Sequence, residues 1–242
     1  MRFLLSLILG LISPLAATPV IGLQNPYLPS TGAGAVGGLD VNYQLVSSTI
    51  TLAGGAPLPD VPGQAHVVTS FPRGAGWGQT FGDPPAKWIS WDADQSNWSR
   101  RSKQTRPRYV SAGSLIYRLA FETEPGSYLA GLGGQVLSDD VVSILLTCDS
   151  GCGQSWGPSR VLRNAGSPAN WQIETPLLPG GSYQLDFTAQ SLGGPVGLAA
   201  TAGGFFIGRG YDTPQVPEPA TTLLSAGVLL GFAIVRRIRG SS

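Results

Sequence analysis

Charge and histidine are what this sequence has least of. Lys, Arg, Asp and Glu make up 12% of the 242 residues, about half the usual share, and His66 is the one histidine. A serine hydrolase of the G-x-S-x-G type needs a histidine after its nucleophile, and His66 precedes the matching letters at Gly153–Gly157. A zinc site needs more ligands than one His and two Cys supply. We therefore predict no catalytic residue, no metal and no cofactor.

An excess of charge of one sign is also lacking. The formal net charge is +1, from 15 basic and 14 acidic residues. Four of the arginines flank apolar runs at the two ends of the chain (Arg2, Arg236, Arg237 and Arg239). Without these four, 11 basic residues face 14 acidic ones, so the body of the chain carries about −3. This balance argues against a nucleic-acid partner.

Sustained helical periodicity is missing between Pro19 and Pro214, whereas apolar and polar residues alternate with period two in several short runs. The clearest runs are Tyr183–Ala189 and Leu115–Phe121. With 34 Gly and 20 Pro as punctuation, the pattern predicts an all-β fold, an antiparallel β-sandwich or jelly roll. Further strands are expected at Val41–Val46, Ala65–Thr69, Val141–Thr147, Val161–Arg163, Trp171–Glu174, Val196–Ala202 and Phe205–Ile207.

The N-terminus has the pattern of a secretory signal peptide. A positive residue, Arg2, precedes the apolar run Phe3–Ile12, and small residues follow up to Ala17. Residues 1–17 are therefore predicted to form a signal helix that is no part of the fold.

A second apolar run, Ala220–Val235, lies near the C-terminus. Its 16 residues would span about 24 Å as a helix, against about 30 Å for the hydrocarbon core of a bilayer. Arg236, Arg237 and Arg239 follow it and would stop the helix on the cytoplasmic side. We expect a single, short transmembrane helix that anchors the chain transiently in the inner membrane.

The order of these features resembles the PEP-CTERM sorting signal of Gram-negative bacteria. The motif residues are Pro217, Glu218 and Pro219, ahead of the apolar run and the basic tail. The resemblance implies recognition and cleavage by an exosortase-type membrane protease, and then release or attachment at the surface of cells that produce exopolysaccharide. The implied organisation is a signal peptide at 1–17, a Gly/Pro-rich lead at 18–38, a β-sandwich ectodomain at 39–208, a linker at 209–216 and a sorting signal at 217–239.

A second resemblance covers residues 40–208. The segments Leu39–Tyr43, Lys87–Ser90, Leu115–Glu122 and Ser138–Asp140 are similar to the extracellular module of many PEP-CTERM proteins. This resemblance implies a sandwich of the galactose-binding, carbohydrate-module type.

The two cysteines, Cys148 and Cys152, are four residues apart in a chain that is predicted to be exported. A disulfide across a hairpin turn is the expected outcome. It would fix a turn and add little to stability, because the loop it closes is so short.

Three tryptophans in loop-like sequence are candidate carbohydrate contacts: Trp77, Trp98 and Trp156. An aromatic ring on a loop can stack on the apolar face of a sugar while polar neighbours bond its hydroxyls. Partial burial in the core is the alternative for each. Trp88 and Trp171 lie in strand-like sequence and are expected in the core.

A basic strip carries five positive charges in nine residues: Arg100, Arg101, Lys103, Arg106 and Arg108. It is either a solvated loop or a surface for an anionic polysaccharide or lipopolysaccharide. Asp92–Asn97 begins like a calcium loop, but Lys103 stands where a bidentate Glu is required, which excludes an EF-hand. A looser calcium site remains an alternative, either at this loop or at the pair Asp139 and Asp140.

The sequence thus predicts an exported, non-catalytic surface or matrix protein associated with exopolysaccharide or another cell-surface glycan. One alternative is a structural or adhesion protein without a discrete ligand site. The other is a glycan-active enzyme, which would need two carboxylates that converge in a cleft. The candidates for such a pair are Glu122, Glu124, Glu174, Asp139 and Asp140.

Overall fold

The structure, a computed structural model, describes residues 18–70, 80–96, 110–138, 141–149, 154–157, 162–163 and 167–208. Within these ranges the fold is all-β apart from one 3₁₀ turn at Ala53–Gly55, which confirms the predicted class. No helix among the described residues is long and apolar enough to cross a membrane. The predicted signal helix and C-terminal helix lie outside the described residues.

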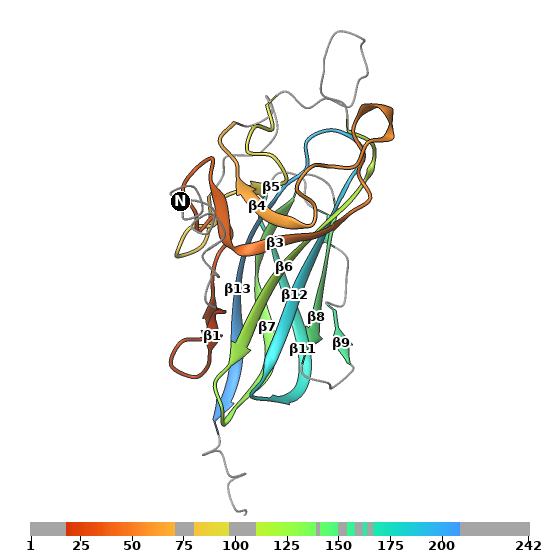
Figure 1. The fold of residues 1–242 in the computed structure, drawn as a ribbon. Coiled ribbons are helices and arrows are strands. Elements are labelled where there is room, and N and C mark those ends of the chain that lie inside the picture. Colours follow the sequence, from red (N-terminus) through yellow and green to blue (C-terminus); the bar gives the residue numbers. More distant parts are fainter. Residues whose placement is uncertain are drawn as a thin grey trace, which may run out of the picture. The chain divides into compact units, whose positions relative to one another are not determined.

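Thirteen strands make up the described part of the chain (Figure 1). Their bounds are β1 Val20–Ile21, β2 Tyr27–Leu28, β3 Leu39–Ser48, β4 Gly63–Val67, β5 Ile89–Ser90, β6 Gly113–Thr123, β7 Ser127–Ser138, β8 Val141–Cys148, β9 Ser155–Trp156, β10 Leu162–Arg163, β11 Ala169–Pro179, β12 Ser182–Ser191 and β13 Leu198–Gly208. The two runs expected at residues 196–202 and 205–207 form one continuous strand, β13.

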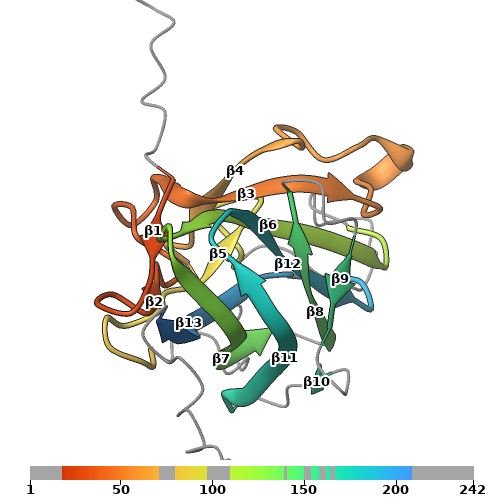
Figure 2. The ribbon, with the colours of Figure 1, turned by 90° about the horizontal axis from the view of Figure 1, so that it is seen from below.

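The strands form one sheet that folds over into two layers. Its order is β10-β8-β12-β6-β3-β4-β5-β13-β7-β11. Figure 2 shows β3 and β6 on one side and β13 and β7 on the other, with β5 between them. The inner faces meet where Trp171 of β11 packs edge-on against Phe187 of β12, with ring centroids 5.8 Å apart. Ladders between the long strands are antiparallel, whereas β1 pairs with β6 in parallel.

The apolar residues of the alternating runs form much of the core. On β12, Tyr183, Leu185, Phe187 and Ala189 are buried, and each lies opposite a buried residue of β6. The Phe121 and Tyr183 rings stack with centroids 5.6 Å apart. Because burying a large apolar side chain stabilises the fold by about 1.5–3 kcal/mol, this pair of strands contributes much of the stability of the sandwich.

The polar face of the same two strands carries an ion pair. Arg118 of β6 lies opposite Asp186 of β12 and donates two hydrogen bonds of 2.7 Å, from Nε and Nη2, to the two carboxylate oxygens. The hydrogen bond to Asp186 raises the pKa of the Arg118 guanidinium.

We expect a coupling energy of about 1 kcal/mol between Arg118 and Asp186, because the geometry is bidentate but Arg118 is a third exposed and therefore screened by water. A double-mutant cycle with Arg118→Ala and Asp186→Ala in urea unfolding measures this energy. It should decrease in 1 M salt. A coupling that is zero at low salt would contradict the expectation.

The lead, residues 18–38, is tied into the sheet. β1 pairs with β6, and β2 pairs with β13. The Thr31 hydroxyl donates to the Lys87 carbonyl oxygen at 2.7 Å and accepts from the Ala200 amide at 2.9 Å. Sequence patterning indicated no strand here, because these contacts join residues that are far apart in the chain.

The buried carboxylate of Asp40 fixes the end of the lead. Its oxygens accept backbone N–H bonds from Gly32 at 2.5 Å, Asn42 at 2.8 Å and Tyr43 at 2.9 Å. Burial first, and then the charge of Asp40, raise the pKa of the Tyr43 phenol, whose hydroxyl donates to the Pro29 carbonyl. Asp40, at the start of β3, therefore holds the lead against this strand.

Candidate functional site: a groove on the outer face of the β13–β7 layer

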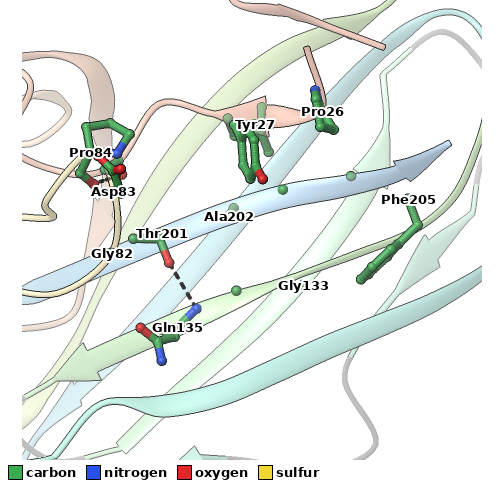
Figure 3. A pocket seen from close by; sticks show the side chains of 15 residues that line it. Pro26, Tyr27, Gly82, Asp83, Pro84, Gly133, Gln135, Thr201, Ala202 and Phe205 are labelled. Atoms are coloured by element: carbon green, nitrogen blue, oxygen red, sulfur yellow. Dashed lines mark hydrogen bonds between the residues drawn. The ribbon is translucent and has the colours of Figure 1, made fainter. Parts of the chain in front are cut away.

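A groove of about 390 Å³ lies on the outer face of the layer formed by β13 and β7 (Figure 3). This volume lies within the usual range for small-ligand sites. Its lining comes from β2, from the loop at residues 82–84, from β7 and from β13. Strands from both ends of the chain thus meet at the groove.

Glycines make the floor of the groove. On β13 the side chains of Ala200 and Ala202 are buried in the core, so Thr201 and Gly203 face outward. On β7 the floor continues with Gly133 and Gly134. A Cβ atom at Gly134 would collide with the carbonyl oxygen of Thr201, so the absence of a side chain lets β7 approach β13 closely. The result is a floor of bare backbone.

Two exposed aromatic side chains flank this floor. Tyr27 of β2 is 67% exposed and lies beside Gly203 in the ladder. Phe205 of β13 is 54% exposed and reaches toward β7, where a Cβ at Gly133 would lie 3.3 Å from its ring (Figure 3). Large apolar rings are normally buried, so two of them at one groove mark a contact surface.

Amide and hydroxyl groups lie at the other end of the groove. The Gln135 backbone N–H donates to Thr201 Oγ1 at 3.1 Å, as Figure 3 shows. The Gln135 side-chain Nε2 donates to Asn170 Oδ1 of β11 at 3.2 Å. Among the described residues, this leaves Gln135 Oε1 as an acceptor and Asn170 Nδ2 as a donor for a ligand.

The third wall is the loop that contains Asp83. The Ser30 hydroxyl donates to the Pro84 carbonyl oxygen at 3.0 Å, which ties the loop to the lead. Asp83 is exposed at this wall and is the one carboxylate among the described residues that line the groove.

A second cavity, of about 460 Å³, lies at the end of β3. Two of its lining hydroxyl groups already bond protein atoms. Ser48 Oγ accepts from the Ile50 amide at 3.0 Å, and Thr51 Oγ1 donates to Ser111 Oγ at 3.2 Å. This cavity has no exposed aromatic side chain in its described lining, so the first groove is the better candidate.

Four of the six tryptophans lie among the described residues. Trp88 and Trp171 are buried, as predicted, and Trp91 is buried as well. Trp156 of β9 is half-buried and packs against the core. Trp77 and Trp98 lie outside the described residues.

Several other predicted residues lie outside the described ranges. They are Cys152, Asp139, Asp140, the basic strip of Arg100, Arg101, Lys103, Arg106 and Arg108, the motif Pro217, Glu218 and Pro219, and Arg236, Arg237 and Arg239. Cys148 ends β8 half-buried against the core and is not a free thiol. Its pairing with Cys152 stays a prediction.

The candidate carboxylates for calcium or catalysis that lie among the described residues are Asp92, Asp94, Glu122, Glu124 and Glu174. Asp92 Oδ1 accepts from the Asp94 amide at 3.1 Å, and Asp94 Oδ1 accepts from the Ser96 hydroxyl at 2.6 Å, so both build turns. Glu122 and Glu174 are exposed on different strands. No group of three or more His, Cys, Asp or Glu side chains suited to a metal occurs among the described residues.

Sequence reasoning missed Tyr27, Phe205 and Gln135. The signal was present in β13, where Thr201 and Gly203 alternate with buried Ala200 and Ala202 and exposed Phe205 follows. Small residues at outward positions followed by an exposed aromatic indicate a hollow next to a contact surface.

Fold and groove together define the class of the body, an all-β, two-layer protein with an open aromatic groove on one sheet. The chain also carries a sorting signal, since residues 215–237 match the family described as the PEP-CTERM protein-sorting motif. This match confirms the resemblance seen in the sequence and indicates an exported protein with a C-terminal sorting signal. No curated protein matches the chain.

Several solved structures are similar to the chain at low identity. One is TmCBM61 in complex with β-1,4-galactotriose, with 11% identity and a TM-score of 0.34, covering 68% of this chain and 90% of that one. A family 29 carbohydrate-binding module has 14% identity and a TM-score of 0.28, with coverages of 66% and 90%. The enzymatically active domain of a bacteriophage tailspike protein has 9% identity and a TM-score of 0.29, with coverages of 65% and 19%.

Proposed function

We propose that this protein is an exported, surface-sorted protein that binds a carbohydrate polymer through the groove between Tyr27 and Phe205. The observation that carries the proposal is the pair of exposed aromatic side chains on a bare glycine floor, with amide groups at one end. The proposal replaces the loop tryptophans by residues of β2 and β13 as the main sugar contacts.

The chemistry of a sugar chain fits these groups. A pyranose ring has apolar C–H faces and a rim of hydroxyls, so it stacks on an aromatic ring while amides bond its edge. Gln135 Oε1 and Asn170 Nδ2 supply one acceptor and one donor. From Thr201 to Phe205 the groove follows five residues of β13, whose ends are about 13 Å apart at the usual rise of a strand. This length suits a short run of sugar rings better than one ring.

Sorting supplies the other half of the proposal. An exosortase-type protease would recognise Pro217, Glu218 and Pro219 while the following apolar run, stopped by Arg236, Arg237 and Arg239, holds the chain transiently in the inner membrane. Cleavage would place the sandwich at the cell surface or in the extracellular matrix, where exopolysaccharide is the abundant glycan. A disulfide between Cys148 and Cys152 would form after export.

The groove favours binding over hydrolysis. Glycoside hydrolysis uses two carboxyl groups on either side of the scissile bond, and the described lining of the groove supplies one, Asp83. The remaining alternative, a structural or adhesion protein without a discrete site, leaves Tyr27 and Phe205 exposed without a role. Trp77, Trp98 and Trp156, together with the basic strip at residues 100–108, are secondary candidates for contact with the same matrix.

Replacing Tyr27 or Phe205 with alanine is expected to weaken glycan binding about tenfold, because each change removes one stacking surface at the centre of the site. Affinity electrophoresis of the full chain in a mild detergent measures the dissociation constants. The gels contain β-1,4-galactan, glucomannan, hydroxyethylcellulose or soluble starch.

Leu192→Ala is the matched control, because Leu192 is a 63% exposed apolar side chain that does not line the groove, and this variant should bind within twofold of the parent. Retention that is equal for the parent and the Tyr27→Ala/Phe205→Ala double variant, or no retention in any gel, would contradict the proposal.

A further inference from the structure

We propose that the groove selects uncharged glycans and rejects chains that carry carboxylates; this inference rests on the proposed function. Asp83 is the one charged residue among the described residues that line the groove. Glu174 of β11 lies on the same outer face, because it is exposed and two residues along the strand from exposed Gln172. A ligand in the groove therefore meets the negative charge of Asp83 in the wall. Glu174 does not line the groove and lies opposite Gly131 in the β7–β11 ladder.

The described basic side chains offer this groove no compensation. The stem of Lys87 packs over Gly32, where a Cβ would collide with it, and Lys87 does not line the groove. Arg118 is held by Asp186 on the β6–β12 layer. Carboxylate recognition in proteins normally uses an Arg or Lys that bonds the anion directly. An anionic sugar ring beside Asp83 would have no such partner among the described residues.

The neutral groups of the groove match neutral ligands. Tyr27 and Phe205 provide ring faces, and Gln135 and Asn170 provide an amide acceptor and donor. None of these four side chains favours an anion over a hydroxyl. The specificity of the groove thus comes from repulsion by Asp83 and Glu174 against an otherwise permissive site.

The test compares each of the four polysaccharides with its lightly carboxymethylated derivative, on the full chain in detergent at about 10 mM ionic strength. At this salt concentration exposed charges act over roughly 30 Å, so electrostatic discrimination is large. We expect the carboxymethylated form of a bound polysaccharide to bind at least fivefold more weakly. A hydroxyethylated form of the same polysaccharide controls for the size of the substituent and should bind within twofold of the parent polymer.

Two variants assign the effect to residues. Asp83→Asn keeps the shape of an exposed side chain. Together with Glu174→Gln it is expected to reduce the discrimination between the neutral and the carboxymethylated polymer to less than twofold. Discrimination in the parent protein should also decrease at 0.5 M salt, since charge repulsion is screened.

The outcomes separate the two proposals. If neither form of any polysaccharide binds, the proposed function fails. If the carboxymethylated form binds as well as or better than the neutral form, the function stands and the selectivity is overturned, which would direct attention to the basic strip at residues 100–108. Discrimination that persists unchanged in the Asp83→Asn/Glu174→Gln variant also overturns the inference.

Discussion

Replacing Asp40 with alanine is expected to lower the free energy of unfolding by about 3 kcal/mol or more. The change leaves the amides of Gly32, Asn42 and Tyr43 without their acceptor in a buried place. Each unsatisfied buried donor costs about 1–3 kcal/mol. Urea unfolding of the full chain in detergent, followed by tryptophan fluorescence, measures the loss.

Two further variants make this test specific. Asp40→Asn keeps one oxygen acceptor and should lose less stability than Asp40→Ala. Glu122→Ala removes an exposed carboxylate from β6 and should change the free energy of unfolding by less than about 0.5 kcal/mol. A loss below about 1 kcal/mol for Asp40→Ala would contradict the assigned role of the three bonds.

Gly134→Ala is expected to destabilise the protein by about 3 kcal/mol. The new Cβ would collide with the carbonyl oxygen of Thr201 and lie 3.0 Å from Ala202 Cα, and both are backbone atoms of β13. A backbone neighbour has no rotamer with which to move away, so β7 and β13 must separate. The same variant should weaken glycan binding, because Thr201 and Gly203 belong to the groove floor.

Gly203→Ala is the control on the partner strand. Its Cβ would lie 3.4 Å from the Pro26 carbonyl oxygen and from the Tyr27 ring, which are ordinary contacts. We expect a change in stability within about 0.5 kcal/mol. Equal losses for the two glycine variants in urea unfolding would show that the close approach of β7 to β13 has no special cost.

The sequence predicted the strands whose two faces differ in polarity. β12 and β6 alternate because one face enters the core and the other meets solvent, so the period-two runs at residues 183–189 and 115–121 predicted both strands. β7 was not predicted, although it is the longest strand among the described residues. Its Gly131, Gly133 and Gly134 lower the intrinsic preference for a strand, and their role appears only when β13 and Phe205 lie next to them.

The site was harder to predict than the fold, because its residues come from distant parts of the chain. Tyr27 lies in a Pro-rich segment that patterning assigned to the lead, and Phe205 lies near the end of the sandwich. Neither residue has a neighbour in sequence that identifies a groove. Only the pairing of β2 with β13 brings them together, and such pairing over more than 170 residues leaves no periodic signal.

The pairing of β2 with β13 also fixes when the groove can form. Chains leave the ribosome from the N-terminus, so β2 emerges early and its partner β13 emerges after the other described strands. Contacts of such high sequence separation form slowly, since the loop-closure entropy must be overcome before they contribute. The hydrogen bond from the Ala200 amide to the Thr31 hydroxyl joins the same two parts of the chain across 169 residues. The groove therefore cannot be complete before β13 is available, and a chain cut short before residue 198 would have the aromatic ring of β2 without the strand that makes it a site.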